Sequence, residues 1–218
     1  DLHELMQYRS VLYSLIYRHI VVRYRDTIFG SIYAVVLPIF NMLLFTFVFS
    51  YVTQVQTDGI PYPIFSYSGL ILWAFFSAVI SGAAGSILGN LSMLTKVYFP
   101  RIFFPLTPGL ASLSDYLISL CVLGFLIVYY NYHLSLLVFL VPIAVLGTFF
   151  LGFGIGSIFA TLTVKYRDMQ MITPAFIQIL MFISPVLYPV TTFPSSLSWI
   201  LQLNPMSSFL NIHRACLL

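Results

Sequence analysis

The chain has 218 residues, of which 60% are hydrophobic and 7% are charged, and its mean hydropathy is +0.99. About a quarter of the residues of a soluble domain are charged, so this composition excludes a water-soluble fold and indicates a polytopic membrane protein. The net charge of +3 does not indicate nucleic-acid binding, because the cations border apolar runs and form no continuous stripe.

The basic residues are clustered. Eight of the nine lie in residues 9–25, 96–101 and 165–167, and long, nearly uncharged stretches separate these segments. Lys and Arg near the ends of membrane spans are retained in the cytoplasm, so we expect all three segments, and the N-terminus, on the cytoplasmic side. No short apolar segment follows a basic cluster at the start of the sequence, and a signal peptide is not expected.

Residues 1–27 are predicted to form an amphipathic helix in the membrane interface, because Leu5, Leu12 and Leu15 recur at helical intervals away from the charged positions. The alternative is a cytoplasmic helix that packs on the protein itself. The first span is long enough to cross about 30 Å of hydrocarbon at about 1.5 Å per residue. Five spans are predicted, at about residues 28–52, 64–86, 103–129, 134–164 and 172–188.

Residues 189–218 contain apolar pieces that are too short to cross a bilayer, and Pro194 and Pro205 interrupt them. We therefore expect half-helices that dip into the membrane from outside, since irregular backbone at this depth must be sheltered by protein or water. With the N-terminus inside, five spans place the C-terminal segment outside. Arg214, the ninth basic residue, is then expected on the outer face. The sequence predicts a single transmembrane domain over residues 1–218.

Asp115 is the carboxylate placed well inside a span. A buried acid is costly in a membrane, so we expect a structural hydrogen bond in preference to a proton relay, which requires partners that the sequence does not reveal. The glycines of residues 85–89 and 152–156 are predicted to let helices approach closely. His133 and His213 are expected to be solvated in external loops, and neither belongs to a catalytic set.

The cysteines have no partner at metal-ligand spacing, so neither a metal site nor a disulfide is expected. Tyrosines near span ends are interpreted as an interfacial belt. The alternative is that some inward-facing aromatic rings line a path for sugars. The tyrosines assigned to the interfacial belt are Tyr51, Tyr62, Tyr129, Tyr130 and Tyr188.

Five short motifs follow one another along nearly the whole chain: residues 23–30 (RYRDTIFG), 94–101 (LTKVYFPR), 164–168 (VKYRD), 184–189 (SPVLYP) and 203–206 (LNPM). As an ordered set they resemble the permease subunit of type-2 ATP-binding-cassette exporters of polysaccharides, namely O-antigen, capsule and teichoic acid. The resemblance implies an all-α transmembrane helix bundle with an N-terminal interfacial helix, cytoplasmic coupling helices and external re-entrant half-helices.

The resemblance also implies a homodimer in the cytoplasmic (inner) membrane of a bacterium, driven by two separate ATPase subunits that bind ATP and magnesium. No cofactor or catalytic residue is then expected on this chain. The residues expected to contact the ATPase are Arg23, Arg25, Lys96, Tyr98, Phe99, Arg101, Tyr166, Arg167 and Asp168. An external gate is expected at Pro194, Trp199, Asn204 and Pro205.

Relatives of this kind carry a sixth span, so the sequence is interpreted as truncated after Leu218. The substrate implied by the resemblance is a lipid-linked polysaccharide. Two alternatives stay open: a type-2 exporter of another substrate, such as a drug, haem or a lipid, and a membrane-embedded enzyme that acts on a lipid-linked sugar.

Overall fold

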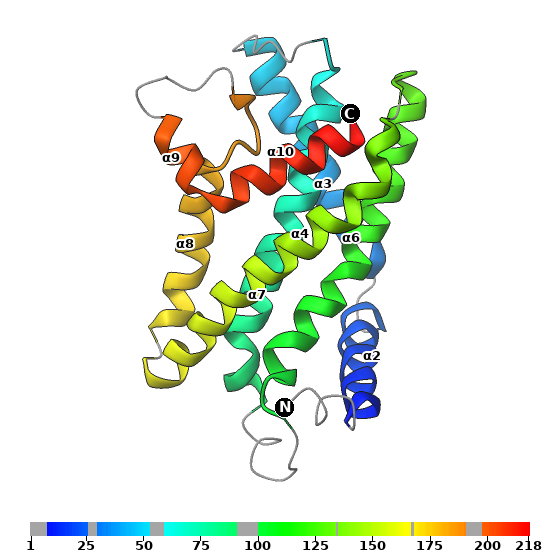
Figure 1. The fold of residues 1–218 in the computed structure, drawn as a ribbon. Helices are drawn as coiled ribbons and strands as arrows, with labels where there is room; N and C mark the ends of the chain where they lie inside the picture. Colours follow the sequence, from blue (N-terminus) through cyan, green and yellow to red (C-terminus); the bar gives the residue numbers. More distant parts are fainter. Residues whose placement is uncertain are drawn as a thin grey trace.

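The computed structural model describes residues 8–25, 30–52, 59–90, 100–133, 135–166, 168–190 and 198–218, and in these ranges the backbone forms helices and turns (Figure 1). The all-α prediction is therefore confirmed. The elements are α2 (Arg9–Arg25), α3 (Gly30–Thr46), a π-helical turn (Phe47–Val52), α4 (Tyr62–Gly89), α6 (Phe103–Tyr129), a 3₁₀ turn (Leu136–Leu140), α7 (Val141–Lys165), α8 (Met169–Ile183), α9 (Ser198–Leu203) and α10 (Pro205–Leu217).

Within the described residues, three helical segments are long and apolar enough to cross a membrane: Tyr62–Gly89, Phe103–Tyr129 and Leu136–Lys165. They coincide closely with the predicted second, third and fourth spans. Two shorter apolar helical stretches, Val36–Phe49 and Met169–Ile183, lie within the predicted first and fifth spans. Hydrophobicity and length thus located the long helices correctly, because apolar side chains are stable on every face of a helix in lipid.

The fifth predicted span extends to residue 188, but α8 ends at Ile183. Residues 184–189 instead form a turn that contains Pro185 and Pro189. The clash between a proline ring and the residue before it disfavours helical backbone at that residue, and Ser184 is accordingly extended, with ψ of 142°. The helix is therefore shorter than the predicted span at this end, because the apolar residues continue past the point where Pro185 ends the helix.

Helix α4 forms the centre of the bundle and packs against α6 and α7. Its contact with α7 depends on glycine. A Cβ atom added to Gly156 would lie 2.7 Å from the Cβ of Ala83, and one added to Gly152 would lie 3.1 Å from the side chain of Val79. The packing role predicted for residues 152–156 is therefore confirmed.

The same prediction for residues 85–89 is wrong. A Cβ atom added to Gly85 or Gly89 would meet no atom within 4 Å. Gly82, one turn earlier on α4, is the glycine that receives a neighbouring helix, because its Cβ would lie 2.7 Å from the Cβ of Pro108 on α6. Sequence spacing identified small residues on α4, but it did not show which side of the helix faces a partner.

The chain reverses direction so that the end of α4, the start of α6, the end of α7 and the start of α8 lie together, at the bottom of the view in Figure 1. Helix α2 lies beside the first part of α6 at this same end. The turn of residues 184–189, α9 and α10 lie at the opposite end. The basic residues of α2, together with Arg101 and Lys165, therefore share one end of the bundle, as the charge pattern predicts.

Candidate functional site

The turn of residues 184–189 is held to the bundle by a buried arginine. Arg214 of α10 is 7% exposed, and its guanidinium donates to the carbonyl oxygens of Pro185, at 2.6 Å, and Val186. The guanidinium also lies 3.9 Å from the centre of the Phe65 ring on α4, in a cation–π contact. Gly69, one helical turn further along α4, leaves room for the guanidinium.

Two further hydrogen bonds fix the same turn. The Tyr62 hydroxyl donates to the carbonyl of Leu187 at 2.8 Å, and the Asn204 side-chain amide donates to the Ser184 hydroxyl at 2.8 Å. Asn204 also caps α10, because its side-chain oxygen accepts from the backbone N–H of Met206 at 3.0 Å. The turn is thus held from α4, from the α9–α10 junction and from α10.

His213 is fully buried, so the expectation that it is solvated in an external loop is wrong. Its Nε2 lies 2.8 Å from the hydroxyl of Tyr116 on α6. The physical reason is the position of α10, which lies against α4 and α7 and turns one face into the bundle. Tyr62 is likewise buried and bonded, so it does not belong to the predicted interfacial belt, whereas Tyr129 is 69% exposed.

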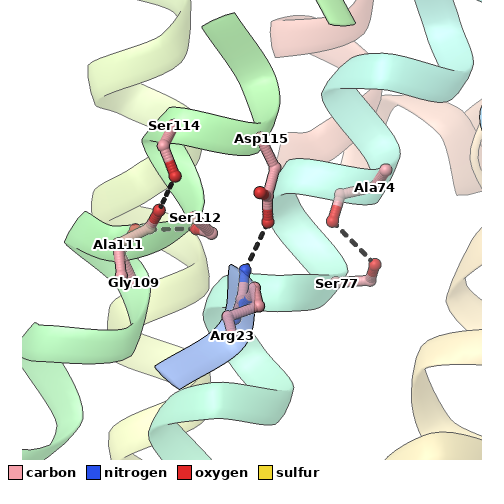
Figure 2. A network of polar contacts seen from close by, with 8 residues as sticks. All are labelled: Arg23, Ala74, Ser77, Gly109, Ala111, Ser112, Ser114 and Asp115. Atoms are coloured by element: carbon pink, nitrogen blue, oxygen red, sulfur yellow. Dashed lines mark hydrogen bonds and ion pairs between the residues drawn. The ribbon is translucent and has the colours of Figure 1, made fainter. Parts of the chain in front are cut away.

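Away from this turn, Arg23 of α2 forms an ion pair with Asp115, which lies near the middle of α6 (Figure 2). The two side chains are 38% and 26% exposed, respectively. Ser112 and Ser114, which are also drawn in Figure 2, donate to carbonyls of their own helix, as serine commonly does in apolar helices. Asp115 therefore has a structural partner 92 residues earlier in the chain, which the sequence alone did not reveal. Its part in transport stays a prediction.

Helix α2 also packs on α6 through apolar side chains. Phe103 and Phe104 are buried beneath Tyr8 and three aliphatic residues of α2, which are Val11, Leu12 and Leu15. Tyr13 and Tyr17, on the other side of α2, are 72% and 63% exposed. The helix thus packs on the protein, as the alternative interpretation holds, and it keeps an exposed aromatic side that suits the predicted membrane interface.

The predicted ATPase contacts lie partly outside the described residues. Arg101 is exposed just before α6, and Tyr166 and Asp168 are exposed between α7 and α8, so these three share the end where α2 lies. Arg23 is there too, but it is paired with Asp115. The predicted contacts outside the described residues are Lys96, Tyr98, Phe99, Arg167 and the side chain of Arg25.

The predicted gate residues lie at the opposite end. Trp199 of α9 is 56% exposed, Pro205 begins α10, and Asn204 lies buried between the two helices. Pro194 lies outside the described residues. Two short helices, α9 and α10, lie in the segment where half-helices are expected, and their entry into the membrane from outside stays a prediction.

The sequence analysis missed the contacts that hold α10 in place, which Tyr116, His213 and Arg214 make. One signal was available. Arg214 is a cation in an apolar segment, and a charge within the membrane marks a site with specific partners. Its partners are backbone carbonyls, and a sequence pattern cannot identify those.

Comparison with known proteins shows several relatives of this chain. The O-antigen export system permease protein RfbA of Myxococcus xanthus is 33% identical over 215 residues, which cover 97% of this chain and 82% of that protein. A Klebsiella pneumoniae protein of the same name is 28% identical over 79% of this chain and 66% of its own length. The polysialic acid transport protein KpsM of Escherichia coli is 24% identical over a stretch that covers 81% of this chain and 69% of that protein.

The family model described as ABC-2 type transporter matches residues 10–218. The match begins within α2 and includes every later described helix, so it extends over both ends of the bundle. This chain is a membrane protein that belongs to the ABC-2 type transporter family.

Proposed function

We propose that the chain is the permease half of an ATP-driven exporter that moves a lipid-linked polysaccharide across the cytoplasmic membrane of a bacterium. The observation that carries the proposal is the match to O-antigen and polysialic acid transport proteins along most of the chain. In this proposal two copies form the pathway, and the energy comes from two ATPase subunits that bind ATP and magnesium. No catalytic residue is assigned to this chain.

The distribution of charge supports the place proposed for the ATPase. Arg101, Tyr166 and Asp168 are exposed at the end of the bundle where α2 lies, and we assign this end to the cytoplasm because Lys and Arg are retained there. Compact loops joined to long helices can transmit the movement of a docked subunit into the membrane. The N-terminus is then inside, and α9 and α10 face outward.

Two observations support the proposed gate at the outer end. Two short helices, α9 and α10, interrupt the pattern of long helices there, and Asn204 at their junction is bonded to the turn of residues 184–189. A movement of the turn would therefore displace the two half-helices together.

Co-expression of the full-length protein with its ATPase subunit tests the proposal. We expect the two to co-purify and lipid-linked polysaccharide to stimulate ATP hydrolysis. Arg101→Glu should abolish this stimulation while membrane insertion is retained, because the proposal assigns this exposed cation to the ATPase contact. The matched control is His133→Glu, which adds a negative charge at an exposed position of the opposite end. Undiminished stimulation in Arg101→Glu would contradict the coupling assignment.

A further inference from the structure

A cleft of about 610 Å³ lies between α2, the second half of α4 and the first turns of α6. It is at the end of the bundle that carries the basic segments, and it is separate from the turn that Arg214 holds. Its lining residues are Leu15, Arg18, His19, Val22, Arg23, Ser81, Gly82, Gly85, Ser86, Gly89, Asn90, Phe104, Thr107 and Pro108.

The charged groups of the lining all come from one face of α2. Arg18 and Arg23 contribute two guanidinium groups, with His19 between them, and among the described residues no carboxylate belongs to the lining. Asp115 is the acidic residue nearest in the described fold, where it is paired with Arg23. Burial lowers the pKa of His19 below its ordinary value, and the charges of Arg23 and Arg18 lower it further. The cleft therefore has a positive potential that favours an anion.

Glycine keeps the wall formed by α4 open. Gly85 and Gly89 lie one turn apart, and a Cβ atom on either would meet no atom within 4 Å. The polar groups beside them are already bonded within α4, because Ser86 donates to the carbonyl of Ala83 and the Asn90 amide donates to that of Ser86. Arg18 and Arg23 also take part in interactions within the protein, but a guanidinium has five N–H donors and a positive charge, so these two groups are the ones of the described lining that attract an anion.

The remainder of the lining is apolar and comes from all three helices, with Leu15 and Val22 on α2 and with Phe104 and Pro108 on α6. A soluble anion has no apolar part that would pack against this wall. A lipid with a phosphate head group needs both parts, because guanidinium groups bind phosphate oxygens in bidentate geometry and the chain next to the phosphate must stay out of water. Basic pockets between membrane helices on the cytoplasmic side bind such head groups.

We propose that this cleft binds the phosphate or pyrophosphate group of a membrane lipid, with Arg18 and Arg23 as the anion ligands. A guanidinium carries five N–H donors, so Arg23 can hold Asp115 and a phosphate at the same time. Bound lipid would then fasten α2 to α4 and α6. Only the assignment of the lipid as a glycan carrier rests on the proposed function; the phosphate chemistry does not.

The binding test uses the full-length protein in nanodiscs of phosphatidylcholine. Phosphatidylglycerol, a polyprenyl pyrophosphate and inorganic pyrophosphate are titrated separately, and native mass spectrometry counts the bound molecules. We expect one of the two anionic lipids to bind and Arg18→Gln to weaken it by roughly tenfold, in line with the loss of one charge-assisted contact. Inorganic pyrophosphate that binds as tightly as either lipid would overturn the assignment to a lipid.

A second variant fills the cleft without removing charge. Gly85→Leu places a side chain in the open space, and we expect it to weaken lipid binding by at least as much as Arg18→Gln. The matched control is Gly154→Leu on α7, where a Cβ atom also meets nothing within 4 Å but which does not line the cleft. Unchanged binding in both Gly85→Leu and Arg18→Gln, or equal loss in Gly154→Leu, would overturn the site.

The two proposals fail in different ways. If the proposed function is wrong, lipid-linked polysaccharide will not stimulate a co-purified ATPase, yet an anionic lipid will still bind in the cleft. If the cleft proposal is wrong, neither anionic lipid will depend on Arg18 and Gly85, whatever the ATPase does. Preference for polyprenyl pyrophosphate over phosphatidylglycerol would identify the bound lipid as the carrier type, and the reverse preference would identify it as a bilayer phospholipid.

Discussion

Two arginines of the bundle reach between helices, but the surroundings of the two side chains differ. Arg214 is buried, donates to two backbone carbonyls and contacts an aromatic ring. Arg23 is 38% exposed, pairs with a carboxylate and borders an open cleft. The first arginine fixes the backbone of a turn, whereas the second joins two helices at a surface that solvent and lipid can reach.

This difference teaches how a nearly uncharged chain uses its few cations. A buried guanidinium without its acceptors would be very costly, so its position specifies the turn of residues 184–189 closely. The pair of Arg23 and Asp115 is partly exposed, at 38% and 26%, so we expect it to contribute less to stability than the buried contacts of Arg214. We therefore expect substitutions around Arg214 to affect folding and those around Arg23 to affect ligands.

The largest effect is expected for Arg214→Gln. The shorter side chain leaves the carbonyls of Pro185 and Val186 without their donor, and the free energy of unfolding should fall by about 3 kcal/mol, since each buried unsatisfied acceptor costs about 1–3 kcal/mol. Thermal unfolding of the purified protein in detergent, followed by circular dichroism, measures the change. Arg9→Gln, at an exposed position of α2, is the control. Equal unfolding midpoints for the two variants would contradict the structural role of Arg214.

A smaller loss is expected for Gly69→Ala. The new Cβ would lie 2.6 Å from the carbonyl oxygen of Val186 and would also press on the Arg214 guanidinium, so the turn must shift, at a cost of about 1–3 kcal/mol. Gly124→Ala on α6 is the control, because a Cβ there meets nothing within 4 Å. The same unfolding measurement applies. The expectation fails if Gly69→Ala is as stable as Gly124→Ala.

The smallest effect is expected for the pair of Arg23 and Asp115. In a double-mutant cycle of Arg23→Gln and Asp115→Asn, we expect a coupling free energy of only about 0.2–1 kcal/mol, the range measured for solvent-exposed ion pairs. Chemical unfolding in detergent supplies the four stabilities. A coupling above about 2 kcal/mol would show that this pair behaves as a buried one, and the contrast between the two arginines would be lost.

Much of the fold was predictable because lipid imposes simple rules. The long helices α4, α6 and α7 lie where uninterrupted apolar residues predicted spans, and α9 and α10 flank the junction marked by Asn204 and Pro205. Errors arose where tertiary contacts decide. His213 was expected in a loop but is buried against Tyr116, since its surroundings depend on how α10 lies on the bundle.

The candidate sites show the same division. The charge pattern placed the segments of Arg101 and Asp168 between predicted spans, and both residues are exposed beside helix ends, whereas their expected contact with the ATPase came from the family resemblance and stays a prediction. The pairing of Arg23 with Asp115 was not, because 92 residues separate the two. The open space at Gly85 was also hidden, since small residues at helical spacing are compatible with a packed contact or with a cleft.

The sequence by itself determined that this protein lies in lipid, the approximate positions of the three long helices of the described residues, and the separation of its basic residues from the rest. These properties follow from the cost of charge in hydrocarbon, which acts on each residue locally. The tertiary structure alone decided which polar groups meet. Arg214 finds the carbonyls of a turn, and Arg23 finds a carboxylate beside a cleft, because hydrogen bonds and ion pairs require a geometry that only packed helices establish.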